Sequence, residues 1–117
     1  MPKITIYQKP TCSTCRDAIK LLTASKQPYI PVNYYEQPFT RTKLKQLLKK
    51  TGLMARDILR TKEDIYKKLS LSRKSLSEDQ LIDLMVKHPD LIQRPIVEKG
   101  NTAMLARPAE TLKQLLR

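Results

Sequence analysis

Residues 3–25 constrain the fold more than any other part of the chain. The segment KITIY at residues 3–7 is short and rich in β-branched and aromatic residues, which predicts a buried strand. After a proline turn, apolar residues recur at helical spacing as far as Ser25, which predicts a helix that begins near Cys12. The chain has two cysteines, and both Cys12 and Cys15 fall where the strand passes into this helix.

A second strand and a helical insertion are expected after this helix. Residues 28–35 read PYIPVNYY, and Pro31 places this strand at the edge of a sheet. A helix joins the two strands, so they are expected to be parallel. An insertion over about residues 38–92 follows, and its last helix starts with Ser77 and Gln80 in capping-box spacing. The helices expected within it span residues 40–52, 55–71 and 77–89.

The end of the chain predicts a hairpin and a closing helix. Two short apolar segments, 95–100 and 102–106, flank a Gly-Asn turn, which is typical of a hairpin. Residues 107–117 predict a helix with Pro108 at its first position. The order β-α-β, helical insertion, β-β-α predicts an α/β fold of the thioredoxin-like class, in a single domain over residues 1–117.

The charge of the chain is strongly positive. It carries 23 lysines and arginines against 11 acidic residues, a formal net charge of +12. Residues 41–74 hold 12 of the basic residues and 3 of the acidic ones. Such a charge attracts nucleic acid, an acidic protein or a small oxyanion, and it also fits a solvated helical face that keeps a chain soluble. Aromatic residues are sparse in this segment, so direct nucleic-acid binding is not expected.

Composition predicts a cytoplasmic protein. No apolar run approaches the roughly 18 residues that span a bilayer, so no membrane association is expected, and the N-terminus lacks the apolar stretch of a signal peptide. In a reducing compartment, a close cysteine pair is more typical of redox chemistry or metal binding than of a structural disulfide. A zinc site needs about four ligands. The chain offers two cysteines and His88, so no metal is expected.

The cysteine pair is the strongest candidate for a catalytic centre. Unpaired N–H groups at a helix N-terminus stabilise a thiolate at Cys12, and Arg16 follows one turn later. Cys15 lies at i+3 on the same side, within reach of a disulfide with Cys12. We therefore expect Cys12, Cys15 and Arg16 to form the catalytic group. A thioredoxin-type disulfide exchanger, or two inert buried thiols, are the alternatives from this pattern alone.

Four motifs carry a resemblance to a known family. They are ITIYQKPTCSTCR (4–16), DILRTKE (57–63), EDQLIDLMVKHPDLIQRPIV (78–97) and ARPAE (106–110). Together they resemble the arsenate reductases that use glutathione and glutaredoxin, and their sister branch of Spx-type transcriptional regulators. The resemblance covers almost the whole chain and implies a thioredoxin-like fold with a helical insertion.

The resemblance implies a mechanism and a set of site residues. Cys12 matches the nucleophile, Gln8 and Pro95 support the site, and the bond before Pro95 is expected to be cis. Planar guanidinium groups suit tetrahedral oxyanions. The arginines implied to bind arsenate are Arg60, Arg94 and Arg107. Reduction to arsenite would need no bound cofactor, only an external thiol reductant, either glutathione with glutaredoxin or thioredoxin.

Two departures from the family pattern open an alternative function. Gln8 stands where members typically have histidine, and Cys15 stands where they have serine. A Cys12–Cys15 disulfide would serve a reductase, but it would equally serve a redox-sensing regulator that binds RNA polymerase. The later ARPAE motif, which such regulators usually lack, supplies Arg107 and favours the reductase.

Overall fold

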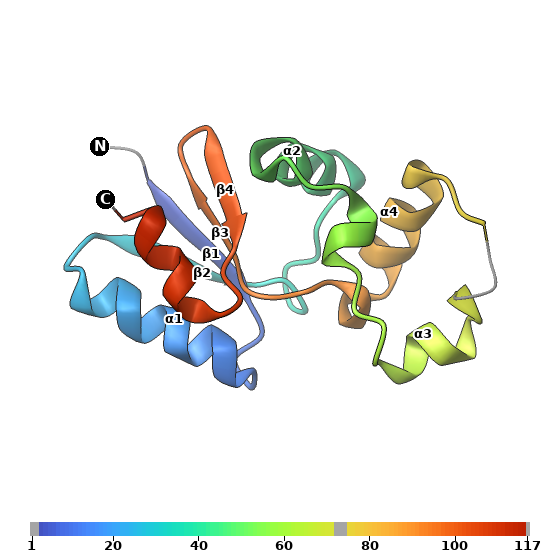
Figure 1. The fold of residues 1–117 in the computed structure, drawn as a ribbon, viewed down its shortest axis with the longest axis horizontal. Coiled ribbons are helices and arrows are strands. Elements are labelled where there is room, and N and C mark those ends of the chain that lie inside the picture. Colours follow the sequence, from blue (N-terminus) through green and yellow to red (C-terminus); the bar gives the residue numbers. More distant parts are fainter. Residues whose placement is uncertain (1–2, 72–74, 117) are drawn as a thin grey trace. The chain divides into compact units, whose positions relative to one another are not determined.

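The computed structural model describes residues 3–71 and 75–116. The end of the basic segment 41–74 and the last residue of the predicted helix 107–117 therefore lie outside the described residues. The chain forms two compact units, which we call the sheet unit and the helical unit (Figure 1). The sheet unit is residues 1–37 with 94–117, and the helical unit is residues 38–93.

A four-stranded mixed sheet with the order β2-β1-β3-β4 forms the sheet unit. Strand β1 (Ile4–Gln8) pairs in parallel with β2 (Tyr29–Asn33) and antiparallel with β3 (Ile96–Lys99). Strand β4 (Thr102–Leu105) completes an antiparallel hairpin with β3. The predicted parallel pair and hairpin are confirmed. Strand β2 lies at the edge of the sheet, where the missing N–H of Pro31 does not interrupt the hydrogen bonds between central strands.

One face of this sheet is covered by helix α1 (Ser13–Ala24) and the 3-10 helix η4 (Ala109–Gln114) (Figure 1). Side chains alternate along a strand, so Ile4 and Ile6 of β1 both point into the core on this face. Gln8 is the next residue with the same orientation. The helix predicted to begin near Cys12 is thus confirmed, and its apolar side fills the core.

The closing helix differs from the prediction. We expected Pro108 at the first position of a helix over 107–117, whereas Pro108 caps a 3-10 helix and follows a cis bond to Arg107. The N–H of Thr111 bonds to the carbonyl of Pro108, a span of three residues. The buried residues of this segment also recur every third position, which suits a 3-10 helix because side chains at i and i+3 are aligned. They are Ala109, Leu112 and Leu115.

The helical unit contains the three predicted helical segments. Helix α2 spans Arg41–Thr51 and ends at Gly52, whose φ of 75° is the left-handed conformation that glycine adopts without strain. The segment predicted over 55–71 holds the 3-10 helix η1 (Ala55–Ile58) and the short helix α3 (Asp64–Lys68). The last two elements are α4 (Glu78–Lys87) and the 3-10 helix η3 (Pro89–Leu91).

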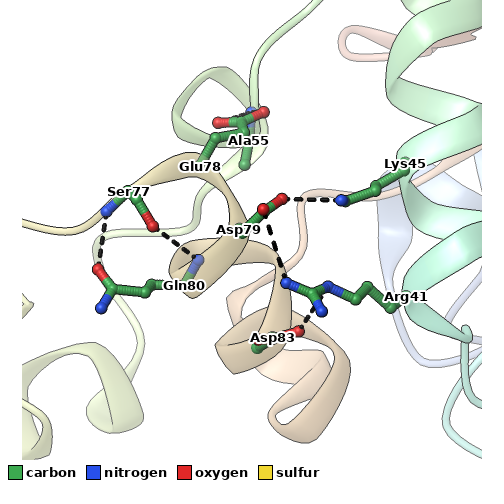
Figure 2. Close-up of polar contacts among 8 residues, drawn as sticks. All are labelled: Arg41, Lys45, Ala55, Ser77, Glu78, Asp79, Gln80 and Asp83. Atoms are coloured by element: carbon green, nitrogen blue, oxygen red, sulfur yellow. Dashed lines mark hydrogen bonds and ion pairs between the residues drawn. The ribbon is translucent and has the colours of Figure 1, made fainter.

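Polar side chains join α2 to α4 in the helical unit (Figure 2). Asp79 pairs with Lys45 at 2.8 Å, and Asp83 pairs with Arg41 at 3.1 Å. The predicted capping box is present, because Ser77 accepts a hydrogen bond from the Gln80 N–H and the Gln80 side chain accepts one from the Ser77 N–H. No helix in the described part of the chain is long and apolar enough to cross a membrane.

Candidate active site

Cys12 is the residue that begins helix α1. Its extended backbone, with φ −83° and ψ 125°, sets it at the N-cap. Its N–H donates to the Lys9 carbonyl at 3.0 Å, and its own carbonyl accepts from the Arg16 N–H at 3.0 Å. No side chain caps this helix, so the N–H groups of its first turn are available to the Cys12 sulfur.

The surroundings of Cys12 lower the pKa of its thiol. Partial burial raises this pKa, but hydrogen bonds from the Cys15 N–H, the Cys15 thiol and the Thr14 N–H lower it. The positive charge of Arg94 lowers it further, and the resulting pKa is about 7. The lowered pKa raises the fraction of Cys12 that is thiolate at neutral pH, and the thiolate is the nucleophilic form of a cysteine.

Cys15 has the opposite environment. It is a fully buried residue of the first turn of α1. This burial raises the pKa of its thiol to about 12, and the hydrogen bond to Cys12 and the Cys12 charge add to the effect. Both cysteines are free thiols in the structure. The pair therefore holds one ionisable sulfur and one protonated sulfur side by side.

Arg94 is the cation that the fold brings to this pair. Its side chain is buried, with 7% of its surface exposed, and its Nη1 donates to the Tyr35 hydroxyl at 3.5 Å. Burial alone would lower its pKa, but Tyr34, Tyr35 and the Cys12 sulfur raise it. The guanidinium therefore stays charged beside the thiolate.

Arg107 joins the same region of the sheet unit. Its Nη1 donates to the Arg94 carbonyl at 3.0 Å, and Arg107 as a whole is an exposed residue. The bond between Arg94 and Pro95 is cis, which confirms that prediction. Arg107 thus contacts the loop that carries Arg94, and its predicted role in binding an oxyanion stays a prediction.

Arg60 and Arg16 are the two other arginines predicted for the site. Arg60 belongs to the helical unit, where its Nε pairs with Glu63 at 2.9 Å and its Nη1 donates to Gln93 at 3.3 Å. Arg16 is an exposed residue of the first turn of α1. The roles expected for both arginines remain predictions.

Two buried side-chain atoms have no hydrogen-bond partner among the described residues. They are Oε1 of Gln8 and Nε of Arg94. Both belong to the sheet unit, and a buried donor or acceptor without a partner is rare because its desolvation is not compensated. The unpaired Nε of Arg94 is a donor that an anion with free oxygens could satisfy, which is compatible with the predicted oxyanion role of Arg94.

Comparison with known proteins assigns the family. The model of the ArsC family matches residues 7–115, which includes both cysteines and all three predicted oxyanion-binding arginines. The chain belongs to the ArsC family.

Named relatives and solved structures agree with this family. An arsenate reductase from Escherichia coli is 36% identical over 116 residues, which cover 99% of this chain and 82% of that protein. A second protein of the same species, the uncharacterized protein YfgD, is 39% identical and covers 97% of each chain. The solved arsenate reductase from Vibrio cholerae has a TM-score of 0.91 with 35% identity over 97% of each chain. The thioredoxin-like fold is confirmed.

Sequence reasoning did not assign Tyr34 and Tyr35 to the site of this ArsC-family chain. Both follow the carboxyl end of β2, and the carboxyl end of the neighbouring parallel strand leads to Cys12. Ligand sites form at the carboxyl ends of parallel strands, and this position was the available signal. Lys9 lies 4.8 Å above the Tyr35 ring, so the tyrosine links two cations of the site.

Proposed function

We propose that this chain reduces arsenate to arsenite through the Cys12 thiolate. Membership of the ArsC family and the relatives named arsenate reductase support the reaction. The observation that carries the proposal is the difference between the two thiols beside Arg94. The pKa of Cys12 is lowered to about 7 and the pKa of Cys15 is raised to about 12.

The first step uses Cys12 as the nucleophile. Its sulfur attacks arsenic, a sulfur–arsenic bond forms, and one arsenic–oxygen bond breaks with release of hydroxide, which takes up a proton to become water. Arg94 and Arg107 bind the remaining oxygens and offset the repulsion between an anionic substrate and an anionic sulfur.

The second step transfers the electron pair. A second thiol attacks the Cys12 sulfur, a disulfide bond forms, and the sulfur–arsenic bond breaks with its electron pair left on arsenic. Arsenic is thereby reduced from the pentavalent to the trivalent state, and two thiols are oxidised. We assign the second thiol to Cys15, whose side chain hydrogen-bonds Cys12. As the Cys15 sulfur attacks, its proton passes to an oxygen of the departing arsenite, so the step does not require Cys15 to ionise first.

An external thiol reductant then restores the two cysteines. Either glutathione with glutaredoxin or thioredoxin supplies two electrons by thiol–disulfide exchange. A reducing cytoplasm contains both of these reductant systems. The disulfide is attacked at Cys12, which is partly exposed, since Cys15 is fully buried. The chemistry needs no bound cofactor. The comparisons do not favour the alternative, a regulator that binds RNA polymerase.

An arsenate-reduction assay with each reductant supplied separately tests this proposal. We expect turnover with thioredoxin, and we expect Cys15→Ser to remove most of it because no internal thiol can then release arsenite. Glutathione with glutaredoxin should support the Cys15→Ser protein better than thioredoxin does, since glutathione can act as the second thiol. No arsenite from the native chain with either reductant would overturn the proposal. Unchanged thioredoxin-coupled turnover in Cys15→Ser would remove Cys15 from the mechanism.

A further inference from the structure

The two unpartnered buried atoms of the sheet unit have opposite hydrogen-bonding character. Oε1 of Gln8 is an acceptor, and Nε of Arg94 is a donor. Each side chain is more than nine-tenths buried, with 7% of its surface exposed. Leaving either atom unpaired costs free energy of folding. A binding partner that satisfies both must present an acceptor and a donor together.

The fold sets both side chains at the same end of the sheet. Gln8 is the last residue of β1, and it shares the face of Ile4 and Ile6 on which α1 packs. Tyr7 is paired with Ile96, so one further step of this antiparallel register sets Gln8 beside Pro95, the neighbour of Arg94. The turn from Lys9 to Cys12 then connects Gln8 to the nucleophile.

Oxyanions differ in whether they carry a donor. Arsenate and phosphate keep at least one proton at neutral pH, so each offers a hydroxyl donor as well as unprotonated oxygens. Sulfate is fully deprotonated and offers acceptors alone. A site with guanidinium donors binds all three anions, whereas a buried acceptor gains a hydrogen bond only from the protonated ones.

We propose that Gln8 is a specificity-determining residue that selects protonated oxyanions. Its Oε1 accepts a hydrogen bond from the hydroxyl of the anion, while Arg94 Nε donates to an unprotonated oxygen. This proposal deepens the proposed function and rests on it, since it concerns the same oxyanion site. It predicts that arsenate and phosphate are favoured over sulfate through one side-chain oxygen.

The test is a calorimetric titration of the reduced full-length chain with phosphate and with sulfate, neither of which reacts with a thiol. The readout is the change in the ratio of the two dissociation constants when Gln8 is replaced by Met, which is similar in length and offers no strong acceptor. We expect the preference for phosphate to fall roughly tenfold in Gln8→Met, with sulfate affinity nearly unchanged. Gln8→Glu retains an acceptor, so it should keep the preference for phosphate over sulfate while it weakens the binding of both anions.

Gln27→Met is the matched control. Gln27 lies before β2, at the opposite end of the strands, and its amide is already satisfied by the Leu116 carbonyl and Lys99. We expect Gln27→Met to lower the melting temperature and leave the anion ratio unchanged. Gln8→Met should not lower the melting temperature, because it removes a buried acceptor that has no partner in the free chain.

The outcomes separate this proposal from the proposed function. If the native chain reduces arsenate and binds both anions, but Gln8→Met keeps the native ratio, the role of Gln8 is wrong and the reductase stands. If the native chain binds neither anion, the role of Gln8 is wrong in any case. If it also forms no arsenite, the proposed function fails too.

Discussion

Polar side chains find their hydrogen-bond and ion-pair partners differently in the helical unit and in the sheet unit. In the helical unit, polar groups satisfy one another at the surface. Asp79 pairs with Lys45 and Arg41, and Ser77 and Gln80 exchange two hydrogen bonds (Figure 2). The ion pairs join α2 to α4, and the capping box satisfies the start of α4. Among the described residues of this unit, no buried side-chain donor or acceptor lacks a partner.

In the sheet unit, polar groups are buried and only partly satisfied. Gln8 and Arg94 each keep one atom without a partner, and Cys12 has a lowered pKa. These features are unfavourable for folding. A bound anion that pairs with the unsatisfied atoms, or a reaction that uses the thiolate, offsets this free-energy cost. The difference indicates that substitutions at Gln8, Cys12 and Arg94 change activity, whereas substitutions in the contacts of α2 and α4 change stability.

The largest effect is expected from Cys12→Ser. A serine hydroxyl is protonated at neutral pH and is a poor nucleophile at arsenic, so arsenate turnover should fall by several orders of magnitude. Circular dichroism should show an unchanged fold and melting temperature, because Cys12 is only partly buried. Retained turnover in this variant would exclude Cys12 as the nucleophile.

Thiol alkylation as a function of pH tests the contrast between the two cysteines. The thiolate is the reactive form, so the rate at Cys12 should rise about fiftyfold between about pH 5 and pH 7 and level off above its pKa of about 7. Cys15, with a pKa of about 12, should remain unlabelled over this range. Mass spectrometry after iodoacetamide treatment counts the labels. If the alkylation rate of Cys12 reached half of its maximum near the pKa of an ordinary free thiol, the described environment of Cys12 would be contradicted.

Arg94→Lys should raise the KM for arsenate roughly tenfold, because lysine keeps the charge but loses the planar pair of donors. The matched control is Arg56→Lys, the same change at an exposed arginine of the helical unit that donates to the Leu76 carbonyl. Steady-state kinetics of both variants give the comparison. Equal KM values for Arg94→Lys and the native chain would remove Arg94 from the oxyanion site.

The smallest effects are expected in the helical unit. Ser77→Ala removes the N-cap of α4 and should cost about 1 kcal/mol of unfolding free energy in urea denaturation. Asp79→Asn should cost less, since exposed ion pairs contribute little. Neither change should alter kcat/KM for arsenate. A loss of activity with unchanged stability in either variant would break the division of roles between the two units.

Local sequence signals predicted the elements well where one pattern acted alone. The cysteines marked the start of α1, Ser77 and Gln80 marked the start of α4, and Gly52 marked the end of α2. The closing segment was mispredicted as an ordinary helix, because its apolar residues recur every third position and favour a 3-10 helix against the core.

The sequence by itself determined the order of the elements and the position of Cys12 at a helix N-terminus, because strand alternation, helical spacing and caps act over a few residues. Only the tertiary structure decided that Arg94 faces Cys12, that Cys15 is buried, and that Gln8 keeps an unpaired oxygen. These properties depend on strand register and on packing between segments distant in the chain. Burial and electrostatic contact arise from that packing, and no local pattern encodes them.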